Sequence, residues 1–290
     1  MSENLVAMKD DALLNTDASF NRFNDAYVKY LWATEKHKHF LLDLINAVFD
    51  DKRPACITGK VTDITLEDRE LPSDHVMEKH GRLDIRAETS NGELIDIEIQ
   101  TYPEVLGARE LFYFAKLYAS QPARGMNYNV LKPVVIINLM ALNFFKDREQ
   151  YHSCYELQER DLHDVITDKI SIHFIEAQKC KELSVKNKNR LVRWMKYLTY
   201  SSPEDVVEIA REDEVFAHVL EAEKMFVRNR EEMLKYEAQE RYEMDMATIK
   251  AEGKLEALLA TAKEMLAGGL NVEQVKKFTK LTDKELANLL

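Results

Sequence analysis

The chain has 290 residues and a formal net charge of −11 at pH 7, with 46% hydrophobic and 31% charged residues, 8 Gly and 6 Pro. This composition excludes collagen-like, low-complexity and wholly disordered proteins. It favours a soluble, helix-rich globular protein, with one body of about 150 to 200 residues and an appendage.

Cysteine content and hydropathy narrow the class further. Cys56, Cys154 and Cys180 form no CxxC pair, so the sequence indicates neither a disulfide framework nor a zinc site. The longest apolar run is roughly half of the ~20 residues that a membrane span needs, and the first residues lack a signal-peptide pattern. We therefore expect a cytoplasmic protein with no membrane association.

The N-terminal third is expected to begin with a loose leader. Residues 1–19 are polar and show no sustained period. From Phe20 to Phe49 the apolar spacing is helical, which predicts one broken helix or two, with Thr34 as a candidate N-cap. Residues 60–67 alternate imperfectly between apolar and polar side chains and predict a strand.

The clearest element is a hairpin over residues 82–101, whose two arms alternate on either side of Ser90-Asn91-Gly92. A two-residue turn would mix polar and apolar side chains on both faces. A three-residue loop with Gly92 in the left-handed conformation sorts them by face instead. It pairs Ile85 with Ile97 on the apolar face and Asp84 with Glu98 on the other.

Directly paired carboxylates repel each other unless a positive charge lies between them. Mg²⁺ prefers oxygen ligands and is often held by one or two carboxylates, so Asp84 and Glu98 could form half of a metal site, with Gln100 facing the same way. The alternative is a solvated strand pair whose acids are balanced by Arg82 and Arg86.

The rest of the chain predicts a mixed sheet followed by helices. A helix is expected from after Pro103 to about Ser120, with its buried stripe formed by Leu111, Phe114, Ala115 and Tyr118. The run PVVIINLMAL and residues 169–177 predict buried strands, which gives an α/β mixed sheet flanked by helices.

Everything after about residue 186 reads as helical. Residues 214–252 contain neither Gly nor Pro, which predicts a long helix or helix pair. A short helix is expected to end at Gly268-Gly269, and Asn271 and Thr282 are the expected N-caps of two capping boxes. Acidic residues offset the lysines of these last turns, so a packing or oligomerisation tail is favoured over a DNA-reading helix-turn-helix.

The most basic stretch is residues 179–196, in which Lys186, Arg190 and Arg193 share one helical face opposite an apolar one. Such a face could lie along a phosphate backbone, but it is equally typical of a solvated helix.

Several segments in fixed order resemble the PD-(D/E)XK nuclease superfamily, and specifically its transposase-like branch, the Rpn family of recombination-promoting nucleases. The resemblance covers about residues 20 to 290 and is carried by LLDLINAVF, Asp84, Glu98-Ile99-Gln100, and the row Arg109, Tyr113 and Lys116. It implies a restriction-endonuclease-like mixed sheet with an α-helical C-terminal tail. Its domains would be a leader (1–19), a nuclease-like domain (20–200) and a helical packing or oligomerisation region (201–290).

The same resemblance implies a metal-dependent mechanism. Asp84, Glu98 and the Ile99 carbonyl would hold Mg²⁺, or Mn²⁺ as a substitute, and Gln100 would position a water in place of the superfamily's lysine. Leu83 stands where the superfamily's proline would precede the first acid. Glu35 is a further candidate acid near the metal, or a residue that complements a helix dipole.

Arg109, Tyr113 and Lys116 fall at i, i+4 and i+7, so they would form one helical stripe for the DNA backbone. We therefore expect a Mg²⁺-dependent DNA endonuclease in recombination, mobile-element biology or phage defence, with DNA as its partner and homo-oligomerisation through the C-terminal helices. The alternative is a non-catalytic DNA-binding or protein-interaction module with a decayed nuclease fold.

Overall fold

The computed structural model describes residues 20–67, 84–101, 106–121, 127–184, 186–199 and 202–287, and of Asp84 it describes the backbone. The expected leader lies outside these ranges. The chain divides into two compact units, the first ending at Tyr236 and the second starting at Glu237.

A six-stranded mixed sheet organises the first unit, in the order β1-β2-β3-β4-β6-β5. Strands β3, β4 and β6 are parallel, and the other neighbours pair antiparallel. The strands are β1 (Ile64–Leu66), β2 (Asp84–Thr89), β3 (Leu94–Gln100), β4 (Val134–Met140), β5 (His152–Tyr155) and β6 (Ile170–Glu176). The mixed sheet expected from the sequence is thus confirmed.

The hairpin β2–β3 has the predicted three-residue loop. The Thr89 amide donates to the Glu93 carbonyl at 2.9 Å, and Gly92 has φ +97°, a conformation that glycine adopts without a Cβ clash. Asp84 pairs with Glu98, Ile85 with Ile97 and Arg86 with Asp96. The register that sorts the side chains by face is therefore confirmed.

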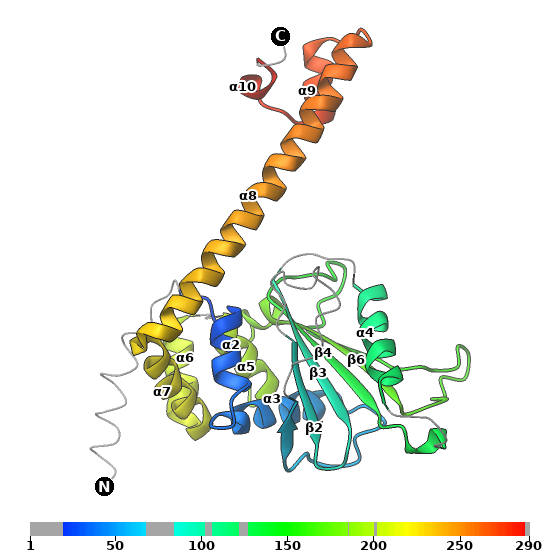
Figure 1. Ribbon diagram of the computed structural model, residues 1–290, viewed down its shortest axis with the longest axis vertical. Coiled ribbons are helices and arrows are strands. Elements are labelled where there is room, and N and C mark those ends of the chain that lie inside the picture. Colours follow the sequence, from blue (N-terminus) through cyan, green and yellow to red (C-terminus); the bar gives the residue numbers. More distant parts are fainter. Residues whose placement is uncertain are drawn as a thin grey trace. The chain divides into compact units, whose positions relative to one another are not determined.

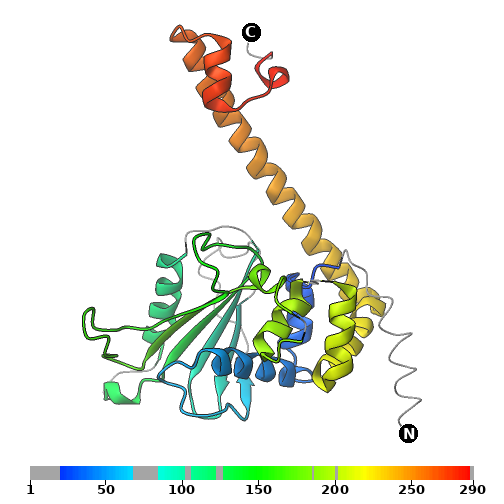
Figure 2. The same cartoon turned by 180° about the vertical axis from the view of Figure 1, so that it is seen from behind.

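Helices cover both faces of the sheet (Figures 1 and 2). Ile85, Ile97 and Ile137 belong to the main core, which the side chains of α2, α3 and α5 share, whereas Leu94, Val134 and Ile136 pack against Leu117 of α4 on the other face. The first-unit helices are α2 (Asp25–Trp32), α3 (Lys38–Asp51), α4 (Ala108–Ala119), α5 (Arg190–Thr199), α6 (Pro203–Glu212), α7 (Glu214–Arg228) and the short 3₁₀ turns η1 (Tyr128–Val130) and η2 (Ala177–Cys180).

Three boundaries differ from the sequence expectation. The N-cap of α3 is His37, and the Thr34 hydroxyl instead donates to the Tyr30 carbonyl at 3.2 Å. Strand β1 is shorter than predicted, since the Asn46 side chain satisfies the backbone of Val61 with bonds of 2.9 Å in both directions. The short helix expected to end at Gly268-Gly269 is the last part of the 38-residue α8 (Arg230–Ala267). Asn229 separates α8 from α7, which agrees with the expected helix pair.

The predicted buried stripe of α4 is wrong in part, since only Phe114 and Tyr118 of its four residues pack against the core. Leu111 is 54% exposed and Ala115 is exposed, whereas Glu110 and Leu117 are buried. Apolar side chains surround this helix on more than one side, so their spacing alone did not determine which side faces the sheet. The observed rotation turns Arg109 toward the sheet.

Helices α6 and α7 belong to the first compact unit, beyond the expected boundary at residue 200. Val206, Ile209, Phe216 and Val219 are buried in the main core. The second unit contains the remainder of α8, α9 (Val272–Thr279) and α10 (Asp283–Leu286), and it has its own small core around Ala262 and Val275. Both predicted capping boxes are present, and Gly269 follows α8 with φ +90°.

Candidate active site

Asp84 and Glu98 are direct partners across β2 and β3. Register partners in a sheet belong to the same face, with Cβ atoms roughly 4.5 to 5.5 Å apart. Glu98 forms an ion pair with Arg109 of α4, so it lies on the face that α4 covers. Glu98 is 1% exposed. A carboxylate this buried requires polar partners, since desolvation of a lone charge is strongly unfavourable.

Those partners are Gln100 and Arg109. The Gln100 Nε2 atom donates to Glu98 Oε2 at 3.0 Å, Arg109 Nη2 forms an ion pair with the same oxygen, and Arg109 Nη1 donates to Gln100 Oε1 at 3.0 Å. The three side chains therefore form a closed hydrogen-bonded triangle. These bonds connect Arg109, the second residue of α4, to the C-terminal end of β3.

Tyr113 completes the support of Arg109. The guanidinium carbon lies 5.4 Å from the Tyr113 ring centroid, a cation–π distance. The structure thus brings Glu98, Gln100, Arg109 and Tyr113 together at one place, while Lys116 is exposed one turn further along α4. The Ile99 side chain is buried in the main core on the opposite face.

Asn138 of β4 is a residue that the sequence reasoning missed. It is the register partner of Glu98 and is fully buried. Its Nδ2 atom donates to the His173 carbonyl at 3.1 Å, and its Oδ1 atom accepts no hydrogen bond from the described part of the chain. The available signal was one amide inside the otherwise apolar run VVIINLM.

The donor set fits a hard divalent cation. Two register-paired acids and a buried amide oxygen lie in one row across the sheet, and oxygen ligands are those that Mg²⁺ prefers. No cluster of three His, Cys, Asp or Glu suited to a metal occurs among the residues described. Mg²⁺ beside a phosphate is usually held by only one or two carboxylates of the protein.

Glu35 lies elsewhere. Its side chain is exposed in the turn before α3 and is 3.5 Å from Lys38, whose ammonium also donates to the Ile64 carbonyl at 3.3 Å. Ile64 pairs with Thr89, five residues along β2 from Asp84, or about 17 Å at the usual strand rise. The structure does not bring Glu35 beside Glu98.

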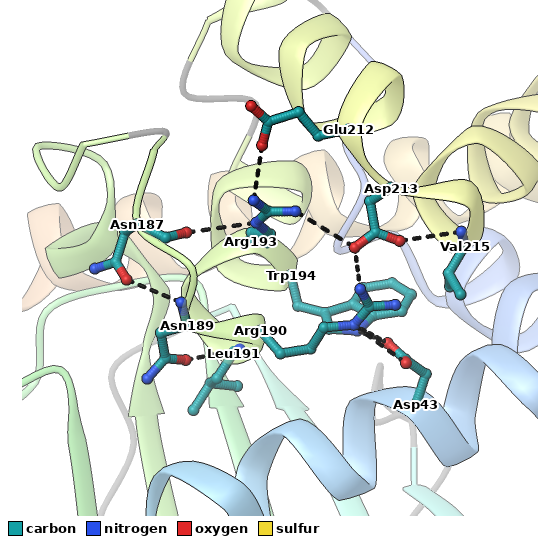
Figure 3. A network of polar contacts seen from close by, with 10 residues as sticks. All are labelled: Asp43, Asn187, Asn189, Arg190, Leu191, Arg193, Trp194, Glu212, Asp213 and Val215. Atoms are coloured by element: carbon teal, nitrogen blue, oxygen red, sulfur yellow. Dashed lines mark hydrogen bonds and ion pairs between the residues drawn. The ribbon is translucent and has the colours of Figure 1, made fainter.

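The basic stretch is used largely for packing (Figure 3). Arg190 binds Asp43 of α3 at 2.8 Å and also pairs with Asp213, and Arg193 binds Glu212 at 2.8 Å. These ion pairs fasten α5 to α3 and to the α6–α7 junction. Lys186 precedes α5 and is exposed, so of the three residues predicted to contact DNA it is the one directed to solvent.

Comparison with known families identifies the family of the chain. A family model described as PD-(D/E)XK nuclease family transposase matches residues 22–253, more than three quarters of the chain. The chain belongs to this family. Searches of curated proteins and of solved structures gave no match.

Membership of the PD-(D/E)XK transposase family supports a nuclease-type function, and such nucleases generally use divalent metals. The matched region contains the register-paired acids, the triangle around Glu98 and the basic stretch. Within the described ranges, no helix combines the length and apolarity that a bilayer span requires.

A second buried polar network lies on the opposite face of the sheet. His152 joins Asp51 at 2.7 Å and His173 at 2.9 Å, and His173 Nε2 is 2.9 Å from the Ser171 hydroxyl. Burial alone would raise the pKa of Asp51, but hydrogen bonds from His152, Tyr151 and Asn189 hold it below its usual value. Burial, reinforced by neighbouring His152, lowers the pKa of His173 to about 3.

This network predicts that the free energy of unfolding depends on pH in the acid range. His173 takes up a proton near pH 6.5 when unfolded but only near pH 3 when folded, so the unfolded state binds more protons between these values. The free energy of unfolding should therefore decrease as the pH falls below about 6.5, by about 2 kcal/mol at pH 5. Urea unfolding at several pH values would measure this.

The matched variants are His173→Gln and His163→Gln, the latter at an exposed position. The His173 variant should lose much of the slope of stability against pH, and the His163 variant should keep it. Equal slopes in all three proteins would contradict the assignment to His173.

Proposed function

We propose that this protein is a Mg²⁺-dependent DNA endonuclease whose metal ligands are Asp84, Glu98 and the Ile99 carbonyl. The observation that supports this most directly is the register of β2 and β3, which makes the two acids partners on one face of the sheet. Membership of a nuclease family and the buried triangle around Glu98 agree with this proposal.

When bound, Mg²⁺ supplies the polarisation of a phosphate and a lower pKa for a coordinated water, and Mn²⁺ can substitute for it. Gln100 can both donate and accept hydrogen bonds, so its amide is suited to orienting a water next to the acids. Unlike a lysine, it provides no positive charge.

Arg109 provides the positive charge that Gln100 lacks. Its guanidinium contacts both Glu98 and Gln100 and is partly buried, at 11% side-chain exposure. A guanidinium in this position can bind two phosphate oxygens in a bidentate manner. Tyr113 holds the guanidinium, and exposed Lys116 and Lys186 are proposed to contact the DNA backbone.

One observation favours the alternative, a DNA-binding or protein-interaction module without catalysis. The ion pair between Arg109 and Glu98 neutralises the carboxylate that a metal requires. In an endonuclease the guanidinium must share that carboxylate with the cation or turn toward the phosphate. In the alternative the ion pair is the permanent state of the site.

Plasmid nicking distinguishes these two functions. We expect the protein to convert supercoiled plasmid to the nicked form in Mg²⁺ or Mn²⁺, with no conversion in excess chelator. Asp84→Asn should abolish the reaction, and Glu88→Gln should not, because Glu88 lies on the same strand and pairs with Lys132 at 2.5 Å. Salt-sensitive DNA binding without metal-dependent nicking would support the alternative instead.

The biological setting proposed from the family is recombination, mobile-element biology or phage defence. Self-association through the C-terminal helices also stays a proposal. The small core of the second unit, around Ala262 and Val275, shows that this region has packed helices of its own.

A further inference from the structure

A cavity of about 370 Å³ lies on the same sheet face as the candidate active site. This volume is at the lower end of those that hold small organic molecules. Its lining is almost entirely apolar and half aromatic, formed by Leu106, Gly107, Leu111, Phe144, Phe145, Tyr155, Ile172 and Phe174. The cavity is therefore suited to a flat, weakly polar group.

The sheet register places this cavity next to Glu98. Glu98 pairs with Asn138, and Asn138 pairs with Phe174, so the three residues form one row on one face. With neighbouring strands about 4.8 Å apart, the Phe174 backbone is about 10 Å from that of Glu98. Gly107, on the cavity wall, is two residues before Arg109.

The aromatic rings have the geometry of a stacking site. The Phe174 ring meets that of Phe145 at 90° with centroids 5.8 Å apart, and that of Tyr155 at 84° with centroids 5.7 Å apart. A planar ligand in such a corner can stack on one ring and meet the edge of another, which are the two favoured aromatic arrangements.

A buried ion pair holds two of these rings in place. Glu176, at the end of β6, is 1% exposed, and its Oε1 accepts from the backbone N–H groups of Phe144 and Phe145 at 2.7 and 2.9 Å. Its other oxygen pairs with Lys179 at 2.5 Å, and the Lys179 ammonium donates to the Phe145 carbonyl at 2.8 Å. The wall is thus rigidly supported on its buried side.

The rim carries a positive charge. Arg148 is exposed, its guanidinium carbon lies 4.7 Å from the Phe145 ring centroid, and it donates to the Tyr155 hydroxyl at 2.8 Å. An apolar aromatic cavity with a cation at its mouth is complementary to a nucleotide, whose base is flat and whose phosphate is anionic.

We propose that this cavity binds an unstacked nucleobase of the DNA strand whose phosphate is bound by Arg109, beside Glu98. The inference rests on the proposed nuclease function and extends it by naming the substrate class, which is single-stranded or locally unpaired DNA. A base within a duplex cannot enter the cavity without leaving its stack, and this is easiest where pairing is already lost.

The test measures binding in excess chelator, so that no cleavage occurs, at one fixed salt concentration. The probes are a fluorescent single-stranded oligodeoxynucleotide and a strand of equal length made of tetrahydrofuran abasic residues, which keeps the phosphates and lacks the bases. Wild-type protein should bind the base-bearing strand about tenfold more tightly than the abasic one. It should also bind it more tightly than a fully paired duplex.

Two adjacent positions on α4 give a matched pair of variants. Leu111→Trp should fill the cavity, since Leu111 lines it and is 54% exposed, so the fold can tolerate the change. Phe112→Trp introduces the same residue at a 62% exposed position outside the lining. The first variant should lose the preference for base-bearing DNA and the second should keep it. Phe145→Ala should reduce the preference by removing a stacking surface.

The other outcomes distinguish failure of the cavity assignment from failure of the nuclease proposal. If plasmid is nicked with Mg²⁺ but wild type binds both strands equally, the cavity assignment fails and the nuclease proposal stands. If the base preference is present and lost in Leu111→Trp while no nicking occurs, the cavity assignment stands and catalysis fails. A change of sedimentation mass in Leu111→Trp, with base preference kept, would assign the cavity to self-association.

Discussion

Glu98→Gln is expected to reduce the rate of Mg²⁺-dependent plasmid nicking by at least about 100-fold. The substitution keeps the shape of the side chain and its hydrogen-bonding capacity toward Gln100, so the sheet should be unaffected. It removes the negative charge that a divalent cation needs and breaks the ion pair with Arg109. Single-turnover conversion of supercoiled plasmid measures the effect.

Glu88→Gln is the matched control, because it makes the same chemical change on the same sheet face at a partly exposed acid. It should nick at close to the wild-type rate. If Glu98→Gln and Glu88→Gln were equally active, the buried acid would have no part in catalysis. Far-UV circular dichroism of both variants would confirm that the fold is kept.

Glu223→Ala is expected to lower the free energy of unfolding by about 3 to 5 kcal/mol. Glu223 of α7 binds Arg22 with two bonds of 2.7 Å, and both residues are almost fully buried. Its Oε2 also accepts from the Tyr197 hydroxyl at 2.6 Å. Removing the carboxylate breaks the buried ion pair from one side only, and that is more destabilising than replacing both partners with apolar side chains.

Two further variants test this explanation by urea unfolding. The double substitution Arg22→Met with Glu223→Leu removes both charges and should recover most of the lost stability. Arg53→Gln breaks an exposed pair with Asp50 and should change stability by less than about 1 kcal/mol. A double variant as unstable as Glu223→Ala would contradict the role given to the one-sided loss of this ion pair.

The hairpin that carries the candidate site could be predicted from sequence because the required information is local. Both arms alternate with period two, and Gly92 marks the loop, so one register places the isoleucines on one face and most of the charged residues on the other. Leu94, the partner of Glu88, is the exception. The family resemblance then pointed to Asp84, Glu98 and Gln100 as the candidate site residues. Alternation alone could not separate a metal site from a solvated strand pair.

The partners of the arginines could not be predicted in the same way. Arg109 was expected on a DNA-facing stripe, yet it binds Glu98, because tertiary packing sets the rotation of α4. Arg190 binds Asp43, 147 residues earlier in the chain, and a local charge pattern contains no information about such a pair. Arginines of the basic stretch thus form ion pairs within the fold.

The aromatic cavity and Asn138 depend on topology. The cavity walls come from the start of α4, from the turn after β4, and from β5 and β6, which lie far apart along the chain. Strand β5 itself, with the sequence HSCY, gives little signal of a strand. Only the order β4-β6-β5 at the sheet edge brings these aromatic residues beside the row that contains Glu98.

The most direct test of the metal site is a calorimetric titration of the whole chain with Mn²⁺ in the absence of DNA. The pairing of Asp84 with Glu98 predicts saturable binding by the wild type and by Glu88→Gln, and loss of binding in Asp84→Asn and in Glu98→Gln. Binding that persists unchanged in both acid variants, or no binding by the wild type, would contradict the assignment of a cation to this end of the hairpin.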